Sequence, residues 1–225
     1  MQMQPIAVFD LDGTLVDTAP DLANSLNACL VGAGLAPSTL AEIRPHAGHG
    51  ARVMLQQAYG RAGHPLLDSE LERQLALFLA HYEANIAVLS KPLPGVVAAL
   101  DRLEAGGYVL AVCTNKTERL SIKLLEELGL ASRFAAICGA DTFAGRKPDP
   151  RHLLGTIGRA GGGPAFLVGD TATDTDAAVA ASVPSVLVDF GYAPDARARA
   201  AATRIIADYA ELDAHLADAL IGLNR

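Results

Sequence analysis

The stretch VFDLDGTLVD, Val8–Asp17, decides the fold class. It opens as an apolar run typical of a buried strand and then places three carboxylates, Asp10, Asp12 and Asp17, close together. Two unit charges about 4 Å apart repel by roughly 4 kcal/mol at an effective dielectric constant near 20. A bound cation is the simplest way to offset this repulsion. The stretch therefore predicts a strand that ends at a cation site.

The composition indicates a globular protein with a well-buried core. Of the 225 residues, 51% are hydrophobic and 19% are charged, and the net charge is −7. This negative charge argues against nucleic-acid and anionic-membrane partners. Three scattered cysteines are too few for a disulfide framework or a thiolate metal site, and they favour a reducing compartment. We find no secretory signal and no apolar stretch of membrane-spanning length, so we expect a soluble cytoplasmic protein.

Strand-like and helix-like segments alternate along most of the chain. Short apolar runs typical of buried strands occupy residues 6–9, 108–114, 135–139, 165–170, 185–190 and 204–208. Helical spacing follows within GVVAALDRLEAGG and TERLSIKLLEELGL, and within residues 151–160, 173–183 and 209–221. This alternation predicts an α/β fold with a Rossmann-like, doubly wound parallel sheet covered by helices on both faces.

The region between the first and second of these strands has a different pattern. Residues 18–90 contain helical spacing and no convincing strand, and the two prolines of KPLPGV follow them. We expect a core made of residues 1–17 and 91–225, with an α-helical cap, residues 18–90, inserted after the first strand. Hinges are expected near residues 15–18 and 90–94.

Polar side chains gather where the predicted strands end. In a doubly wound sheet, ligands bind beyond the carboxyl ends of the strands. Segments far apart in the sequence deliver polar groups to this edge: Asp10, Thr114, Asn115, Lys147, Asp170 and Asp174. A single site is therefore predicted there.

Four segments, DLDGTLVD, CTNK, GRKPDP and GDTATDTDAA, together resemble the four ordered motifs of the haloacid dehalogenase (HAD) superfamily. The helical segment resembles the cap of its phosphoglycolate phosphatase-like subgroup. The resemblance implies a Mg²⁺-dependent hydrolase that acts on a small phosphorylated metabolite, with 2-phosphoglycolate as the best named substrate. It is compatible with a monomer or a homodimer.

The family pattern assigns three catalytic side chains. Asp10 is the nucleophile whose carboxylate attacks phosphorus to form an aspartyl-phosphate. Asp12 donates a proton to the leaving-group oxygen and later accepts one from the hydrolytic water. Lys147 balances the charge of the phosphoryl oxygens and keeps Asp10 ionised.

The same pattern predicts the metal and phosphate ligands. Mg²⁺ takes oxygen ligands from Asp10, the main-chain carbonyl of Asp12, and Asp170. Asp174 is expected as an outer carboxylate that orients Asp170, a metal-bound water or Lys147, and it also fits a helix N-cap. The hydroxyl group of Thr114 and the N–H groups around Asn115 are expected to bind the remaining phosphate oxygens.

Several roles stay open on sequence grounds. Gly48, His49, Gly50 and Arg52 lie in RPHAGHGARVML, which is either a substrate-reading element of the cap or an ordinary glycine-rich helix start. Lys116 either favours an anionic substrate, as Arg52 also could, or begins the next helix. Asp17 is expected to cap the next helix or to brace the loop.

Fold does not determine the reaction, so alternatives to a phosphoglycolate phosphatase remain. One is a phosphatase for another small metabolite or sugar phosphate. Another is a β-phosphoglucomutase-like phosphotransferase, which would pass the phosphoryl group to a sugar hydroxyl instead of water. A non-catalytic binding relative is the third.

Overall fold

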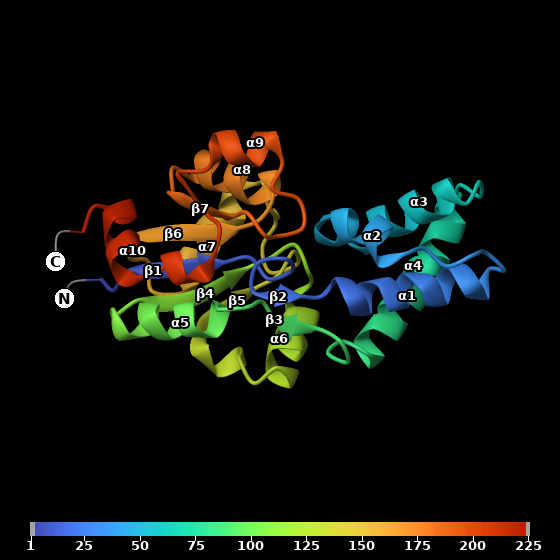
Figure 1. The fold of residues 1–225 in the computed structure, drawn as a ribbon, viewed down its shortest axis with the longest axis horizontal. Coiled ribbons are helices and arrows are strands. Elements are labelled where there is room, and N and C mark those ends of the chain that lie inside the picture. Colours follow the sequence, from blue (N-terminus) through green and yellow to red (C-terminus); the bar gives the residue numbers. More distant parts are fainter. Residues whose placement is uncertain (1–2, 224–225) are drawn as a thin grey trace.

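A six-stranded parallel sheet forms the centre of the computed structural model, which describes residues 3–223 (Figure 1). The strand order is β5-β4-β1-β6-β7-β8, and every neighbouring pair is parallel. The strands are β1 (Ile6–Phe9), β4 (Val109–Cys113), β5 (Phe134–Cys138), β6 (Ala165–Gly169), β7 (Ser185–Val188) and β8 (Arg204–Ile206). The chain runs outward from β1 in one direction and then returns to build the other side. This confirms the predicted doubly wound α/β sheet and places its switch point at β1.

Helices cover both faces of the sheet, as the alternation predicted. They are α5 (Val96–Ala105), α6 (Glu118–Glu127), α7 (Pro150–Arg159), α8 (Ala172–Ala181), α9 (Ala196–Ala201) and α10 (Ala214–Ile221). The fully buried strand β1 supplies both cores: Ala7 and Phe9 face the side covered by α5, α6 and α10, whereas Ile6 and Val8 face α7 and α8. Because both faces are buried, the strand is continuously apolar up to its end.

The helix expected over residues 209–221 is divided into two elements. A short 3₁₀ helix, η3 (Tyr209–Glu211), precedes α10. Asp213 adopts an extended backbone and its side chain accepts a hydrogen bond from the Leu216 N–H, so it starts α10 as a new helix. Another 3₁₀ helix, η2 (Ala131–Arg133), leads into β5.

A helical insertion follows the first strand. It contains α1 (Ala19–Gly32), α2 (Leu40–Ile43), η1 (Arg44–His49), α3 (Ala51–Arg61) and α4 (Asp68–Ala84), which lie to one side of the sheet in Figure 1. Two strands of two residues each, β2 (Val16–Asp17) and β3 (Lys91–Pro92), pair in antiparallel fashion at its base. Such short strands carry no alternating pattern, so the sequence did not predict them. That residues 18–90 form a separate cap domain stays a prediction.

Within residues 3–223, no helix is both long enough and apolar enough to span a membrane.

Candidate active site

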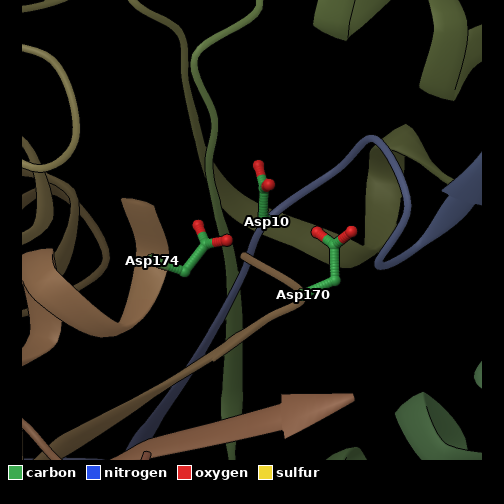
Figure 2. A group of neighbouring side chains, drawn as sticks. All are labelled: Asp10, Asp170 and Asp174. Atoms are coloured by element: carbon green, nitrogen blue, oxygen red, sulfur yellow. The ribbon is translucent and has the colours of Figure 1, made fainter. Parts of the chain in front are cut away.

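Three carboxylates meet at the carboxyl edge of the sheet. Asp10 directly follows β1, Asp170 directly follows β6, and Asp174 lies in the first turn of α8. Figure 2 shows their side chains converging on one space, and each offers an oxygen within 4.8 Å of the other two. All three residues are buried. The three acids therefore lie together at the carboxyl edge of the sheet, as their positions after the predicted strands indicated.

One ammonium group lies among these acids. The Nζ atom of Lys147 is 2.9 Å from Asp10 Oδ1 and 2.5 Å from Asp174 Oδ1, and its side chain is 1% exposed. Burial alone would lower the pKa of Lys147, but Asp10 and Asp174 together raise it above its ordinary value. Lys147 is therefore charged, and it neutralises only part of the cluster.

Burial and mutual repulsion raise the pKa values of two of these acids. The pKa of Asp10 is raised to about 6: burial is the largest cause, Asp174 and Asp12 act in the same direction, and Lys147 opposes them. Burial, followed by Asp174 and Asp10, raises the pKa of Asp170 well above its ordinary value. Asp10 Oδ1 is also buried without a hydrogen bond, because its contact with Lys147 lies outside hydrogen-bonding geometry. A carboxylate oxygen that only the ammonium group of Lys147 contacts, in a cluster with excess negative charge, fits a hard divalent cation.

Asp170 is held rigidly by its neighbours. The hydroxyl group of Thr14 donates to its Oδ1 atom at 3.1 Å, and the N–H of Tyr192 donates to its Oδ2 atom at 2.7 Å. The backbone of Gly13, at φ +79°, passes so close that a Cβ atom there would lie 2.5 Å from Asp170 Oδ2. Glycine is therefore required at this position by both backbone conformation and space.

The carboxylate of Asp12 is bound by two side chains. Lys116 Nζ lies 2.9 Å from both of its oxygens, and the Thr18 hydroxyl donates to Oδ1 at 2.5 Å. The same ammonium group lies 4.7 Å from the centroid of the Tyr82 ring. Asp12 is the leading Coulombic influence that raises the pKa of Lys116 against the lowering effect of burial. Neither of the two roles considered for Lys116 from the sequence included this pairing with Asp12.

Thr114 and Asn115 follow β4 as expected, but they have different environments. The Thr114 N–H donates to the Cys138 carbonyl at 3.0 Å, which continues the pairing of β4 and β5. Its hydroxyl accepts the Lys116 N–H at 3.3 Å. The Asn115 amide donates to the Lys147 carbonyl at 2.9 Å, while its Oδ1 atom is buried and unpartnered. Asn115 thus also braces the Lys147 loop.

Of the two structural roles considered for Asp174, the structure shows the pairing with Lys147; the N-cap of α8 is Thr171, and Asp174 lies at the third helical position. One of its oxygens pairs with Lys147. The other accepts hydrogen bonds from the Thr171 N–H and hydroxyl, at 3.1 and 2.8 Å, and completes the capping box of α8.

A cavity of about 330 Å³ lies between the sheet edge and the helical insertion. The core side contributes most of the predicted site residues: Asp10, Asp12, Thr114, Asn115, Lys116, Lys147 and Asp174. The side formed by the insertion is largely apolar, with Leu22, Leu75, Phe78 and Leu79. Asp170 does not line this cavity but sits behind it, next to the other acids.

The expected cap residues also reach the cavity. Gly48, Gly50 and Arg52 line it, and a Cβ atom on Gly48 would lie 3.7 Å from the Thr171 side chain. Arg52 forms an ion pair with Glu72 at 2.6 Å, with both side chains about half exposed or more. The side chain of His49 lies outside what the structure describes.

Comparison with known proteins identifies the family. A family model for haloacid dehalogenase-like hydrolases matches residues 7–188. The chain belongs to this family. It is 50% identical over 220 residues to the phosphoglycolate phosphatase of Mesorhizobium japonicum, covering 97% of both chains. It is 46% identical to the phosphoglycolate phosphatase of Agrobacterium fabrum, covering 97% of this chain and 95% of that protein. A crystal structure of a predicted phosphoglycolate phosphatase from Haemophilus somnus 129pt has a TM-score of 0.84 at 29% identity, covering 94% of this chain and 97% of that chain.

The chain is thus a haloacid dehalogenase-like enzyme, as the four motifs implied. Sequence reasoning missed several residues around its site. Arg146 lines the cavity, is exposed, and has no acidic partner among residues 3–223. Its position next to Lys147 in the sequence could have identified it as a site residue. His152 accepts the Lys147 N–H on its Nδ1 atom at 3.3 Å, and burial lowers the pKa of His152 to about 4. Nothing in the sequence singled out His152 or Tyr192.

Proposed function

We propose that this haloacid dehalogenase-like hydrolase is a Mg²⁺-dependent phosphoglycolate phosphatase that converts 2-phosphoglycolate and water to glycolate and phosphate. The observation that carries the proposal is the buried Asp10 carboxylate, which is ion-paired with Lys147 at the wall of a small cavity. The names of the two relatives, which match nearly the whole chain, support the choice of substrate.

In the proposed reaction, Asp10 attacks the phosphorus atom of the substrate. A bond forms between its carboxylate oxygen and phosphorus while the bond from phosphorus to the glycolate oxygen breaks. Lys147 keeps the local charge balanced as the phosphoryl group arrives, and the Thr114 hydroxyl and the N–H groups near Asn115 bind its oxygens. Water then cleaves the aspartyl-phosphate.

Asp12 is the proposed acid and base. It gives a proton to the departing glycolate oxygen and takes one from the attacking water. Thr18 and Lys116 hold its carboxylate at the cavity wall, so it is positioned before the substrate arrives. Proton donation requires that substrate contacts replace part of its pairing with Lys116.

The acid cluster is the proposed Mg²⁺ site. Asp10 and Asp170 would hold the ion with the main-chain carbonyl of Asp12, and Asp174 would orient the site through Lys147. When bound, Mg²⁺ supplies positive charge that offsets the repulsion of these acids and of the phosphate group.

A second anionic group on the substrate needs a cation of its own. The sequence suggested Arg52 or Lys116, but the structure pairs Arg52 with Glu72 and Lys116 with Asp12. Arg146 lines the same cavity without an acidic partner among the described residues. We therefore infer that Arg146 contacts the glycolate carboxylate at the cavity mouth.

The experiment that tests this function uses the full chain with a panel of phosphate esters, with Mg²⁺ and with EDTA. We expect phosphate release from 2-phosphoglycolate to be the fastest and to stop in EDTA. Mass spectrometry of trapped protein should locate the phosphoryl group on Asp10. Conversion of β-glucose 1-phosphate to glucose 6-phosphate, followed by ³¹P NMR, would instead indicate the phosphotransferase. No turnover across the panel would indicate the binding relative.

A further inference from the structure

The loop after β7 reaches the base of the helical insertion through Tyr192. Its hydroxyl group accepts hydrogen bonds from the N–H groups of Thr18 and Ala19, at 2.6 and 2.8 Å, and donates to Asp17 Oδ1 at 2.9 Å. The N-cap residue of α1, Thr18, makes no capping hydrogen bond with its own side chain. Tyr192, a residue of the core, therefore caps the N-terminus of α1 in place of the Thr18 side chain. This contact lies at one of the two expected hinges.

An arginine of the insertion closes the same contact from the other side. Arg44, in η1, donates to both oxygens of Asp17, at 3.1 and 2.9 Å. Its guanidinium carbon also lies 5.5 Å from the centroid of the Tyr192 ring. Asp17 ends β2, before the insertion begins, so this bidentate pair crosses the hinge at Thr18. A rotation of the insertion about that hinge would separate Arg44 from both partners.

The other end of Tyr192 is attached to the acid cluster. Its N–H donates to Asp170 Oδ2 at 2.7 Å. Its ring packs against Gly13 so tightly that a Cβ atom on Gly13 would lie 2.8 Å from the ring. At the preceding residue, Gly191, a Cβ atom would lie 2.1 Å from the Asp170 side chain. The loop therefore cannot shift at Tyr192 without disturbing Asp170.

We propose that Arg44, Asp17 and Tyr192 form a clamp that couples the closed position of the helical insertion to the geometry of Asp170. The inference rests on the proposed role of Asp170 as a Mg²⁺ ligand. Closure engages Arg44, which holds Asp17 and Tyr192, and Tyr192 in turn holds the carboxylate that binds the ion. Because coupling between two equilibria is reciprocal, Mg²⁺ binding favours closure by the same factor by which closure favours Mg²⁺ binding. Tyr192 and Arg44 are positioning residues, since neither lines the cavity.

Two variants separate the clamp from the rest of the site. Tyr192→Phe keeps the ring and the N–H bond to Asp170 but removes the hydroxyl group. Arg44→Gln changes only the insertion and leaves the core intact. Arg73→Gln is the matched control, because Arg73 is an exposed arginine of the same insertion that pairs with Glu70.

The first measurement is Mg²⁺ affinity by isothermal titration calorimetry on the full chain without substrate. We expect each clamp variant to weaken Mg²⁺ binding about five- to tenfold, the lower end of typical coupling between sites. The double variant should bind Mg²⁺ no more weakly than the single variant with the lower affinity, because both substitutions break the same connection between the insertion and Asp170. The control should match the wild type. An Arg44→Gln protein that binds Mg²⁺ as tightly as Arg73→Gln, or fully additive effects in the double variant, would overturn the clamp.

The second measurement is hydrogen exchange of the amides at Thr18 and Ala19. In the wild type we expect Mg²⁺ to slow their exchange, and in both clamp variants we expect faster exchange with a smaller Mg²⁺ effect. If the wild type binds no Mg²⁺, the proposed metal site is wrong. Hydrogen exchange at Thr18 and Ala19 then tests the hinge contact separately from the metal site. Equal exchange at these amides in Arg44→Gln and Arg73→Gln would overturn the clamp itself.

Discussion

The sheet edge and the helical insertion form opposite walls of one cavity with very different ion pairs. At the sheet edge, the Lys147 and Asp174 side chains are each 1% exposed and 2.5 Å apart. In the insertion, Arg52 and Glu72 are 49% and 60% exposed. Breaking a buried pair by removing one partner typically costs about 3–5 kcal/mol, whereas an exposed pair contributes about 0–1 kcal/mol. The core therefore holds charges that are costly to remove, and the insertion can vary its exposed ion pairs at little cost to stability.

The largest effect is expected from Asp10→Asn. The substitution removes the proposed nucleophile, so turnover of 2-phosphoglycolate should fall by at least about 10⁴-fold, the scale seen when a nucleophile is deleted. It also removes one charge from the crowded cluster, so the fold should persist and metal-free protein should unfold at a higher temperature. Steady-state kinetics and calorimetry in EDTA measure the two results. Undiminished turnover would show that the core wall does not carry the reaction.

Lys147→Met tests the cost of charge at the core wall. Asp10 and Asp174 would keep their carboxylates but lose the ammonium group between them, which should lower the free energy of unfolding by about 3–5 kcal/mol in metal-free buffer. Urea denaturation at neutral pH gives this value. The matched variant on the other wall, Arg52→Met, should change stability by about 1 kcal/mol at most. Similar losses in the two variants would remove the contrast between the walls.

The pH dependence of stability sharpens the same contrast. The pKa of Asp10 is raised to about 6 in the folded protein, so between about pH 4 and 6 the folded state binds more protons there than the unfolded state. Asp10 therefore lowers the free energy of unfolding as pH rises through this window, by about 3 kcal/mol in total. Urea denaturation in EDTA at pH 4, 5, 6 and 7 should show a shallower decline for Asp10→Asn than for the wild type. Equal slopes would contradict the burial of this charge.

The core wall could be predicted from sequence largely because parallel strands end at a common edge. Asp10, Thr114 and Asp170 each follow a buried apolar run, so their meeting needs no knowledge of side-chain conformation. The sequence could not show which of the predicted site residues form ion pairs with one another. Lys116 reaches Asp12 across 104 positions of sequence, and either Asp12 or a substrate would satisfy an ammonium group.

The insertion could be predicted only as a set of helices. Its periodicity indicated helices within residues 18–90, where the structure has α1, α3 and α4, but the two-residue strands at its base carry no pattern. The face turned to the cavity depends on how the helices pack. Asp17 illustrates the limit: of the two roles expected for it, the structure shows the brace, through Arg44 and Tyr192, and not the helix cap.

The smallest effect is expected for recognition of the substrate carboxylate, for which Arg146 of the core and Arg52 of the insertion are the two candidates. If Arg146 contacts the glycolate carboxylate, Arg146→Ala should raise KM for 2-phosphoglycolate about tenfold, the lower end of the range for a hydrogen bond to a charged group, and leave KM for p-nitrophenyl phosphate nearly unchanged. Arg52→Ala, whose partner is Glu72, should change KM for the two substrates by the same small factor. The ratio of kcat/KM for the two esters in each variant measures this. A selective loss with Arg52→Ala and none with Arg146→Ala would move recognition of the carboxylate from the core to the insertion, because Arg52 would then exchange an exposed ion pair for the substrate.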